Sequence, residues 1–259
     1  MSHHIVEVKN LSHIYPDGTA ALFDVSFRIT HGESVAIIGA NGAGKSTLLL
    51  HLNGCLSATS GEIRIGDTRL TAGTLPDIRR TVGMVFQDPD DQLFMPTVFE
   101  DVAFGPCNLG LSGMDVEQRV SDALERVGAA HLREKPPYHL SGGEKKRVAI
   151  ATVLSMMPDI LVMDEPTSGL DPFARRQLIG LMRDFQHTRI ITSHDLDMVY
   201  EVCDRTIILK RGMVAADGST GDLFENGELL KECQLERPLS LQGCPECAAR
   251  IRSCGTAKC

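Results

Sequence analysis

The sequence has no tryptophan and only three tyrosines and nine phenylalanines in 259 residues, so its core must consist largely of aliphatic side chains. It also contains no apolar run near the ~20 residues that a membrane-spanning helix needs. The first residues, MSHHIVEVKN, lack the long apolar segment of a secretory signal, which predicts a protein that stays on the cytosolic side. Any role at a membrane would then require a partner.

Positively charged residues are fewer than negatively charged ones. The sequence has 26 Lys and Arg residues and 34 Asp and Glu residues, which give a net charge of −8. Proteins that bind nucleic acid usually present a basic face, so this balance disfavours that class, and no nucleic-acid partner is expected. The length and the 42% hydrophobic content predict one large domain, or a domain with a substantial insertion, that can bury a sizeable core.

Cysteine is thinly spread through most of the chain and concentrated at its end. Cys55, Cys107 and Cys203 are predicted to be small buried apolar side chains. Four thiols in the segment CPECAARIRSCGTAKC could bind Zn²⁺ or hold an iron–sulfur cluster. The alternative is a tail of reduced thiols, because the spacing matches no metal-binding motif that we recognise. The candidate ligands are Cys244, Cys247, Cys254 and Cys259.

Short apolar segments alternate with helical periodicity, which predicts an α/β protein with helices packed on a mostly parallel sheet. The helix KSTLLLHLNG should end at Gly54, and GSTGDLFENGELLKE should form a last amphipathic helix region. We divide the chain into a core of residues 1–87 and 158–225, a helical insertion of residues 88–157, and a C-terminal part of residues 226–259. The predicted strands are IVEVKNLSHIY, SVAIIG, EIRIGD, TVGMVFQ, DILVMDEP, RIITSHD and RTIILKRG.

The segment GANGAGKST lies between a predicted strand and a predicted helix and fills the phosphate-loop pattern G-x-x-x-x-G-K-[ST]. Backbone N–H groups of such a loop, together with the helix N-terminus, face the phosphates of a nucleotide. Lys45 would reach the β- and γ-phosphates, and Ser46 would ligate Mg²⁺. The residues expected to bind ATP here are Gly39, Ala40, Asn41, Gly42, Ala43, Gly44, Lys45, Ser46 and Thr47.

Polar residues follow three other buried strands. In ILVMDEP, Asp164 would hold Mg²⁺ and Glu165 would act as the general base for the attacking water, unless this acidic strand end only caps the next helix. His194 would sense the γ-phosphate, the alternative being a hydrogen-bonded structural histidine. Gln87 would bridge Mg²⁺, the water and the helical insertion, the alternative being a plain polar strand end. Lys45, Gln87, Glu165 and His194 are therefore the predicted catalytic residues.

Five segments occur in the order and spacing of ATP-binding-cassette ATPases, which the chain resembles over roughly residues 3–225. They are GANGAGKST, the glutamine at 87, LSGGEKKR, LVMDEPTSGLD and TSH. The resemblance implies a phosphate-loop NTPase fold with a mostly parallel core, an antiparallel β subdomain and a helical insertion. It also implies hydrolysis of ATP to ADP and phosphate. Tyr15 matches the family's adenine-stacking aromatic, although a strand-end tyrosine is the alternative.

The resemblance further implies a dimer, because two cassettes of this family pack head to tail and each signature segment caps the ATP of the other. The glycines allow close approach, and the N-terminus of a helix favours a phosphate. Asp171, in SGLDP, resembles the loop that couples the two sites. At least two of the three residues Lys145, Lys146 and Arg147 are expected on a solvated helix face. The signature residues are Ser141, Gly142, Gly143 and Glu144, the last standing where many members have glutamine.

The run from QDPDDQLF to EDVAFGP resembles the ATPase of energy-coupling-factor importers, particularly of the cobalt/nickel branch. This implies a groove that receives arginine-bearing helices from an integral membrane scaffold, with a separate membrane component that binds the substrate. Carboxylates in this region would meet those arginines, or would form an acidic solvated face. They belong to Asp88, Asp90, Asp91, Glu100 and Asp101.

These observations predict a peripheral ATPase on the cytoplasmic face of the membrane that drives uptake of cobalt or nickel. Vitamin importers use very similar ATPases and remain an alternative. ATPases of chromosome maintenance and DNA repair share the cassette but usually interrupt it with a coiled coil or zinc insertion, and none lies between Gln87 and Ser141. Translation-factor ATPases normally carry two cassettes, and this chain carries one.

Overall fold

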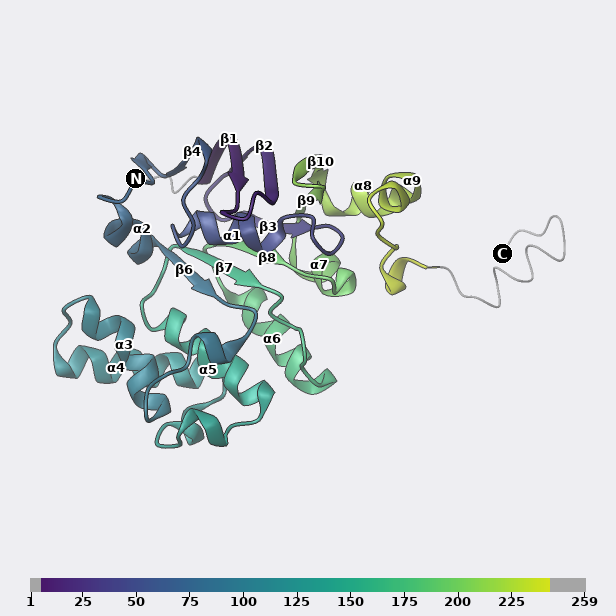
Figure 1. The fold of residues 1–259 in the computed structure, drawn as a ribbon. Helices are drawn as coiled ribbons and strands as arrows, with labels where there is room; N and C mark the ends of the chain where they lie inside the picture. Colours follow the sequence, from purple (N-terminus) through teal and green to yellow (C-terminus); the bar gives the residue numbers. More distant parts are fainter. Residues whose placement is uncertain (1–5, 243–259) are drawn as a thin grey trace, which may run out of the picture.

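The computed structural model describes residues 6–242, which form two sheets with helices on both sides of the larger one (Figure 1). The larger sheet has the order β10-β9-β3-β8-β7-β6 and is parallel except for the pairing of β10 with β9. Its strands are β3 (Ser34–Ile38), β6 (Val82–Val85), β7 (Ile160–Asp164), β8 (Thr188–Thr192), β9 (Arg205–Lys210) and β10 (Met213–Ser219).

The smaller sheet is antiparallel, with the order β2-β1-β4-β5. Its strands are β1 (Val6–Ile14), β2 (Ala20–Ile29), β4 (Ser60–Ile65) and β5 (Thr68–Arg69). The α-helices are α1 (Lys45–Leu52), α2 (Leu75–Thr81), α3 (Val98–Asn108), α4 (Gly113–Arg126), α5 (Gly142–Leu154), α6 (Pro172–Asp184), α7 (Leu196–Val202), α8 (Thr220–Glu225) and α9 (Gly227–Glu232). Short 3₁₀ turns span Pro89–Asp91, Ala130–Leu132, Pro137–His139 and Leu239–Leu241.

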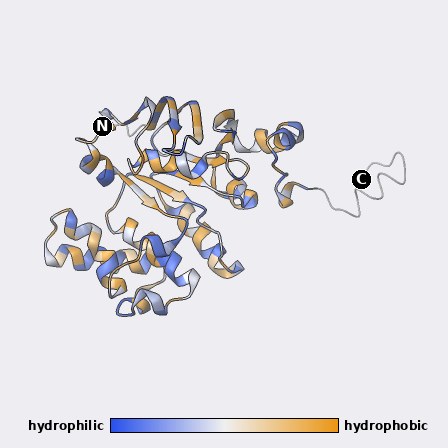
Figure 2. Ribbon diagram, viewed as in Figure 1, coloured by the Kyte–Doolittle hydropathy of each residue, from blue (hydrophilic) through white to orange (hydrophobic). Residues whose placement is uncertain are grey.

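Strands β3, β6 and β7 of the large sheet are buried on both faces, as their continuous apolar runs predict, whereas the edge strand β10 is partly exposed. Side chains alternate between the faces of β3. Val35 and Ile37 join an apolar cluster with α1 and the antiparallel sheet, whereas Ala36 and Ile38 join a second cluster with helices of the opposite layer. Figure 2 shows the result as mostly orange strands in the middle of the molecule, with helices that carry blue outward faces. Helices α3–α5 form a layer of their own between β6 and β7 in the chain (Figure 1).

Several local expectations need correction. The predicted elements do not include β2, β5, β10 or α2, and the last helix region is split, because Asn226 ends α8 and caps α9 by accepting a hydrogen bond from the Leu229 N–H. Cys203 is buried as expected, but Cys55 and Cys107 are exposed. The four candidate metal ligands of the tail lie outside the described residues. Within residues 6–242, no helix is long and apolar enough to cross a membrane.

Candidate functional site

The candidate site lies where three neighbouring parallel strands end. β3, β8 and β7 are adjacent in the sheet, so their carboxyl ends share one edge. The phosphate loop follows β3, His194 follows β8, and Asp164 is the last residue of β7. Ligands of open α/β sheets bind at this edge. The fold thus brings together residues that are far apart in the sequence.

The phosphate loop packs against β9 and β2, and this packing requires glycine at two of its positions. A Cβ at Gly39 would lie 2.4 Å from the carbonyl oxygen of Leu209. Gly44, which caps α1 with φ near 101°, would place a Cβ 2.7 Å from the carbonyl oxygen of Ala21. Because backbone atoms cannot rotate away, both glycines are fixed by close approach.

Lys45 is buried at the centre of this edge. Its Nζ donates to the carbonyl oxygen of Gly39 (2.8 Å) and lies 3.2 Å from His194 Nε2. Burial lowers the pKa of Lys45, and the charges of Glu165 and Asp164 oppose that shift. The lysine is therefore held between the loop, the carboxylates and the histidine, where a phosphate group could meet it.

Tyr15 lies beside the first turn of α1, where its hydroxyl bonds Thr47 Oγ1 (2.9 Å). Its ring meets the buried His13 edge to face at 4.7 Å. His51 Nδ1 donates to the Thr47 carbonyl (2.7 Å), and His51 Nε2 lies 3.2 Å from His13 Nδ1. Because carbonyl oxygens only accept, the hydrogen of His51 lies on Nδ1, and His13 Nδ1, which also bonds the Ser57 carbonyl (3.1 Å), is the donor toward His51 Nε2, which leaves His51 neutral. Burial lowers the pKa of His51, in agreement with this assignment.

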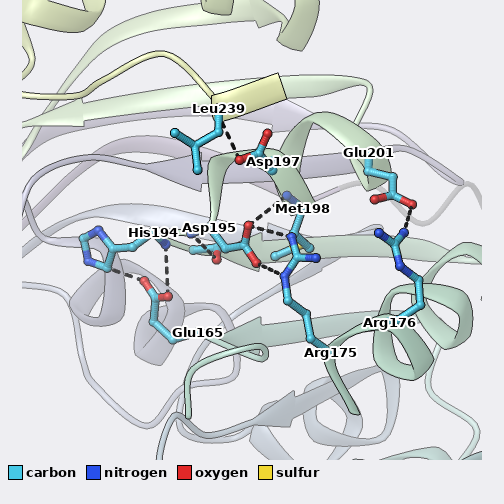
Figure 3. A network of polar contacts seen from close by, with 10 residues as sticks. Glu165, Arg175, Arg176, His194, Asp195, Asp197, Met198, Glu201 and Leu239 are labelled. Carbon is cyan, nitrogen blue, oxygen red and sulfur yellow. Dashed lines mark hydrogen bonds and ion pairs between the residues drawn. The ribbon is translucent and has the colours of Figure 1, made fainter. Parts of the chain in front are cut away.

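The two carboxylates at the end of β7 differ in their hydrogen bonds. Asp164 is buried and accepts from the hydroxyl of Thr192, which is fully buried on β8. Glu165 has φ near 47°, which is uncommon for a residue with a side chain. Its Oε2 accepts from the N–H of His194 (3.0 Å), and its Oε1 lies 3.5 Å from His194 Nε2 (Figure 3). Sequence reasoning missed Thr192, because no local pattern links it to Asp164.

One cleft collects the three residues predicted to ligate Mg²⁺, which are Ser46, Gln87 and Asp164. Their hydroxyl, amide and carboxylate oxygens are ligands that Mg²⁺ accepts, so the donor set fits the ion. No group of three or more His, Cys, Asp or Glu side chains suited to a metal occurs within residues 6–242. The carbonyl of Gln87 accepts from Lys146 Nζ of α5 (2.5 Å), which ties this cleft to the helical layer.

The basic residues of α5 are not on a solvated face, contrary to expectation. Lys145 pairs with Asp90 (2.6 Å). Lys146 is buried, with its pKa lowered by burial, and bonds the carbonyl of Gln87. Arg147 is half-buried and donates to a glutamine of α6. These contacts hold α5 against the core.

The signature segment opens α5 in the helical layer, whereas α1 lies in the layer of the antiparallel sheet (Figure 1). Ser141 and Glu144 form a reciprocal capping box, with Ser141 Oγ donating to Glu144 Oε2 (2.8 Å). Ser141 and Gly142 are exposed, and a Cβ at Gly142 would meet no atom within 4 Å. Gly143 is half-buried. This helix start is open to an approaching molecule.

A groove of about 520 Å³ lies between the core and the helical layer. Phe94 and Phe104 line it, 64% and 42% exposed, with ring centroids 5.1 Å apart. Asp101 also lines it but is buried, and its Oδ1 accepts from the N–H groups of Phe94 and Met95, each at 3.0 Å. Its Oδ2 has no hydrogen-bond partner among the described residues. Burial raises the pKa of Asp101, against the two hydrogen bonds.

The other four carboxylates of this region are exposed, as the alternative of an acidic solvated face predicts. Asp88 and Glu100 cap helices, and Asp90 pairs with a lysine of α5. Asp91 lines the cleft of the predicted magnesium ligands. Asp101 is thus the carboxylate of the five that lines the groove.

Comparisons with known proteins agree with this geometry. The ABC transporter family matches residues 22–168. A Geobacter sulfurreducens protein named as an ABC transporter ATP-binding protein is 74% identical over 247 residues, covering 95% of this chain and 99% of its own. The energy-coupling factor transporter ATP-binding protein EcfA of Methanothermobacter thermautotrophicus is 47% identical, covering 90% and 77%.

Solved structures show the same fold. CbiO1 of Clostridium perfringens, described as part of the ABC transporter complex CbiONQ, superimposes with a TM-score of 0.80 at 38% identity, covering 96% of this chain and 99% of its own. A dimeric ATP-binding cassette, MJ0796, bound to ADP and phosphate, has a TM-score of 0.76 at 30% identity, covering 83% and 98%. With the phosphate loop and the carboxylates at one sheet edge, these matches show that the chain belongs to the ABC transporter family and is an ATP-binding cassette ATPase.

Proposed function

We propose that the chain is the ATP-hydrolysing subunit of an energy-coupling-factor importer that takes up a transition-metal cation, cobalt or nickel. The observation that carries the proposal is the groove beside Phe94 and Phe104, with a buried carboxylate in its wall. Exposed apolar surface around a hollow is typical of a docking site. Similarity to EcfA and to CbiO1 supports the assignment to this kind of transporter.

In the proposed reaction, the phosphate loop binds the nucleotide through its backbone N–H groups, and Lys45 neutralises charge on the phosphates. Ser46, Gln87 and Asp164 would hold Mg²⁺, which supplies further positive charge at the phosphates. Glu165 accepts the proton of the attacking water at Oε1, which makes no hydrogen bond within the described residues. His194 contacts the γ-phosphate from the neighbouring strand end.

The rest of the site is assigned to base binding and to a second cassette. Tyr15 stacks on the adenine. Ser141, Gly142, Gly143 and Glu144 cap the ATP of the other subunit, and Asp171 lies at the dimer interface. The dimer is peripheral to the membrane on its cytoplasmic face, where an integral scaffold subunit docks into the groove.

Asp101 is the proposed anchor for an arginine of the scaffold, because its Oδ2 finds no hydrogen-bond partner within residues 6–242. Pairing a guanidinium with a buried carboxylate gives strong charge-assisted hydrogen bonds. Asp101→Asn keeps the shape and the Oδ1 contacts but removes the charge. Asp91→Asn is the matched control, since Asp91 is a neighbouring carboxylate outside the groove.

The test is a pull-down of the tagged full chain and both variants from detergent-solubilised native membranes, with partners identified by mass spectrometry. The unmodified chain and Asp91→Asn should recover an integral scaffold and a small substrate-binding membrane protein, and Asp101→Asn should lose both. Retention by Asp101→Asn would refute the anchor. Recovery of only non-membrane proteins or nucleic acid would refute the importer and favour a cassette acting on DNA or the ribosome.

A vitamin importer is the second candidate, because vitamin-importing relatives use very similar ATPases. The recovered substrate-binding protein discriminates between the two. Binding of Co²⁺ or Ni²⁺ by that component, measured by calorimetry, supports the cation assignment. Binding of a vitamin instead would refute it and leave the ATPase assignment intact.

A further inference from the structure

The residue after His194 is held by an ion pair that the proposed reaction does not use (Figure 3). Asp195 accepts from Arg175 of α6 in two places, Nε to Oδ2 at 2.5 Å and Nη2 to Oδ1 at 2.8 Å. Each side chain is about one quarter exposed, at 26% for the arginine and 24% for the aspartate. Two-pronged pairs of this kind are strong and fix geometry as well as charge.

Asp195 also organises the backbone at this point. It caps α7 by accepting from the N–H of Met198 (3.0 Å). Burial would raise the pKa of Asp195, but the bonds from Arg175 and Met198 outweigh it and hold the pKa below its usual value. The carboxylate therefore stays ionised near neutral pH.

Arg175 is itself built into the first turn of α6. Asp171 caps that helix by accepting from the N–H groups of Phe173 and Ala174, and the N–H of Arg175 donates to the Asp171 carbonyl (2.9 Å). The backbone of Arg175 is therefore fixed to the Asp171 turn. At the other end, the N–H of His194 donates to Glu165 (3.0 Å). A continuous path runs from the Asp171 turn to the proposed general base.

We propose that Arg175 is a positioning residue for ATP hydrolysis, which acts through Asp195 to fix His194 relative to the Asp171 turn. The inference rests on the proposed role of His194. Nucleotide binding depends on the phosphate loop, to which Arg175 does not belong. Loss of the Arg175 side chain should therefore lower the rate of the chemical step more than the affinity for ATP. Small displacements of a group that contacts the reacting phosphate are costly.

The chain offers a matched control on the same two helices. Arg176 of α6 pairs with Glu201 of α7 at 2.6 Å, away from the start of α7 (Figure 3). Arg176→Gln removes one ion pair between α6 and α7 but leaves the Arg175–Asp195 pair beside His194 intact. An effect of Arg175→Gln that Arg176→Gln does not share comes from positioning rather than from loss of an ion pair.

The experiment measures steady-state MgATP hydrolysis of the full chain, with kcat and KM separated, together with the affinity for a fluorescent ATP analogue. Arg175→Gln should lower kcat about tenfold or more while KM and the affinity change less than about twofold. Asp195→Asn should behave in the same way, and the double variant should be no worse than either single variant. Arg175→Lys should retain more of the rate than Arg175→Gln, since lysine keeps the positive charge but lacks the two parallel N–H donors of the guanidinium.

Two outcomes would overturn the inference. One is a kcat of Arg175→Gln equal to that of the unmodified chain, and the other is an equal loss in Arg176→Gln. If Arg175→Gln does not fold, the comparison of Asp195→Asn and Arg175→Lys with Arg176→Gln decides in the same way. His194→Ala distinguishes failure of the proposed function from failure of the positioning role. If His194→Ala hydrolyses ATP at the normal rate, the proposed role of the histidine is refuted. If His194→Ala is impaired but Arg175→Gln is not, only the positioning role of Arg175 is refuted.

Discussion

Removal of the Thr192 hydroxyl should lower the free energy of unfolding because its hydrogen-bond partner is charged, not because the packing changes. This side chain is fully buried and donates to the carboxylate of Asp164. Thr192→Val keeps the shape and removes the donor, leaving a buried carboxylate short of one hydrogen bond. A hydrogen bond to a charged group contributes about 1.5–3 kcal/mol to the free energy of unfolding, compared with about 0.5–1.5 kcal/mol for a neutral one.

Thr206 supplies the neutral comparison. It is also fully buried, and its hydroxyl bonds that of Thr220 (2.8 Å). Both substitutions exchange a buried hydroxyl for a methyl group, so the transfer contribution cancels in the difference between them. Thr192→Val should therefore lower the free energy of unfolding by about 1 kcal/mol more than Thr206→Val.

The assay is equilibrium unfolding in urea without nucleotide, where the free energy follows from the midpoint and the slope. Thermal unfolding gives a second reading, since about 1 kcal/mol corresponds to roughly 2–4 °C in a domain of this size. A loss in Thr192→Val equal to or below that in Thr206→Val would refute the reasoning. It would mean that the carboxylate of Asp164 does not depend on this donor.

Three further predictions concern the base, the buried histidines and the dimer. Tyr15→Ala should weaken ATP binding about tenfold, because stacking on a base contributes about 1–3 kcal/mol, whereas Tyr15→Phe should bind nearly as the unmodified chain does in the same titration. Burial holds the pKa of His51 below its unfolded value, so its contribution to stability is complete above about pH 6.5 and is lost as the pH falls. Melting temperatures should therefore fall more steeply below that pH in the unmodified chain than in His51→Gln, and parallel curves would contradict this. Lys45→Ala and Ser141→Arg should each abolish hydrolysis, and mixing them should restore part of it if each site combines one chain's loop with the other's signature. No recovery in a mixture that still forms dimers would contradict that arrangement.

The phosphate loop and the β7 carboxylates could be found from the sequence because their chemistry is local. A glycine-rich turn between a strand and a helix has few other uses, and spacing alone fixes Gly39, Gly44 and Lys45 on one loop. The buried strands before Asp164 and His194 could be predicted equally well, because parallel strands covered on both faces consist of continuous apolar runs. The order of the strands did not follow from these runs.

Contacts between residues far apart in the sequence could not be predicted from any local sequence pattern. Lys146 looked like one of three exposed cations, but the approach of α5 to the core buries it against the Gln87 carbonyl. Likewise, Asp101 looked like one member of an acidic run, and only the fold of the loop before α3 brings two N–H groups to one of its oxygens and leaves the other buried without a hydrogen-bond partner among the described residues. Burial of a charged side chain depends on what packs over it, which a single sequence does not record.

Loop geometry and strand ends follow from neighbouring residues, so local sequence specifies which atoms are available for phosphate chemistry. What holds those atoms in place depends on contacts made only in the folded chain. Thr192 reaches Asp164 from the adjacent strand, and Arg175 reaches Asp195 from another helix. Hydrogen bonds of this kind form only when the sheet order and the helix packing bring donor and acceptor within about 3 Å of each other.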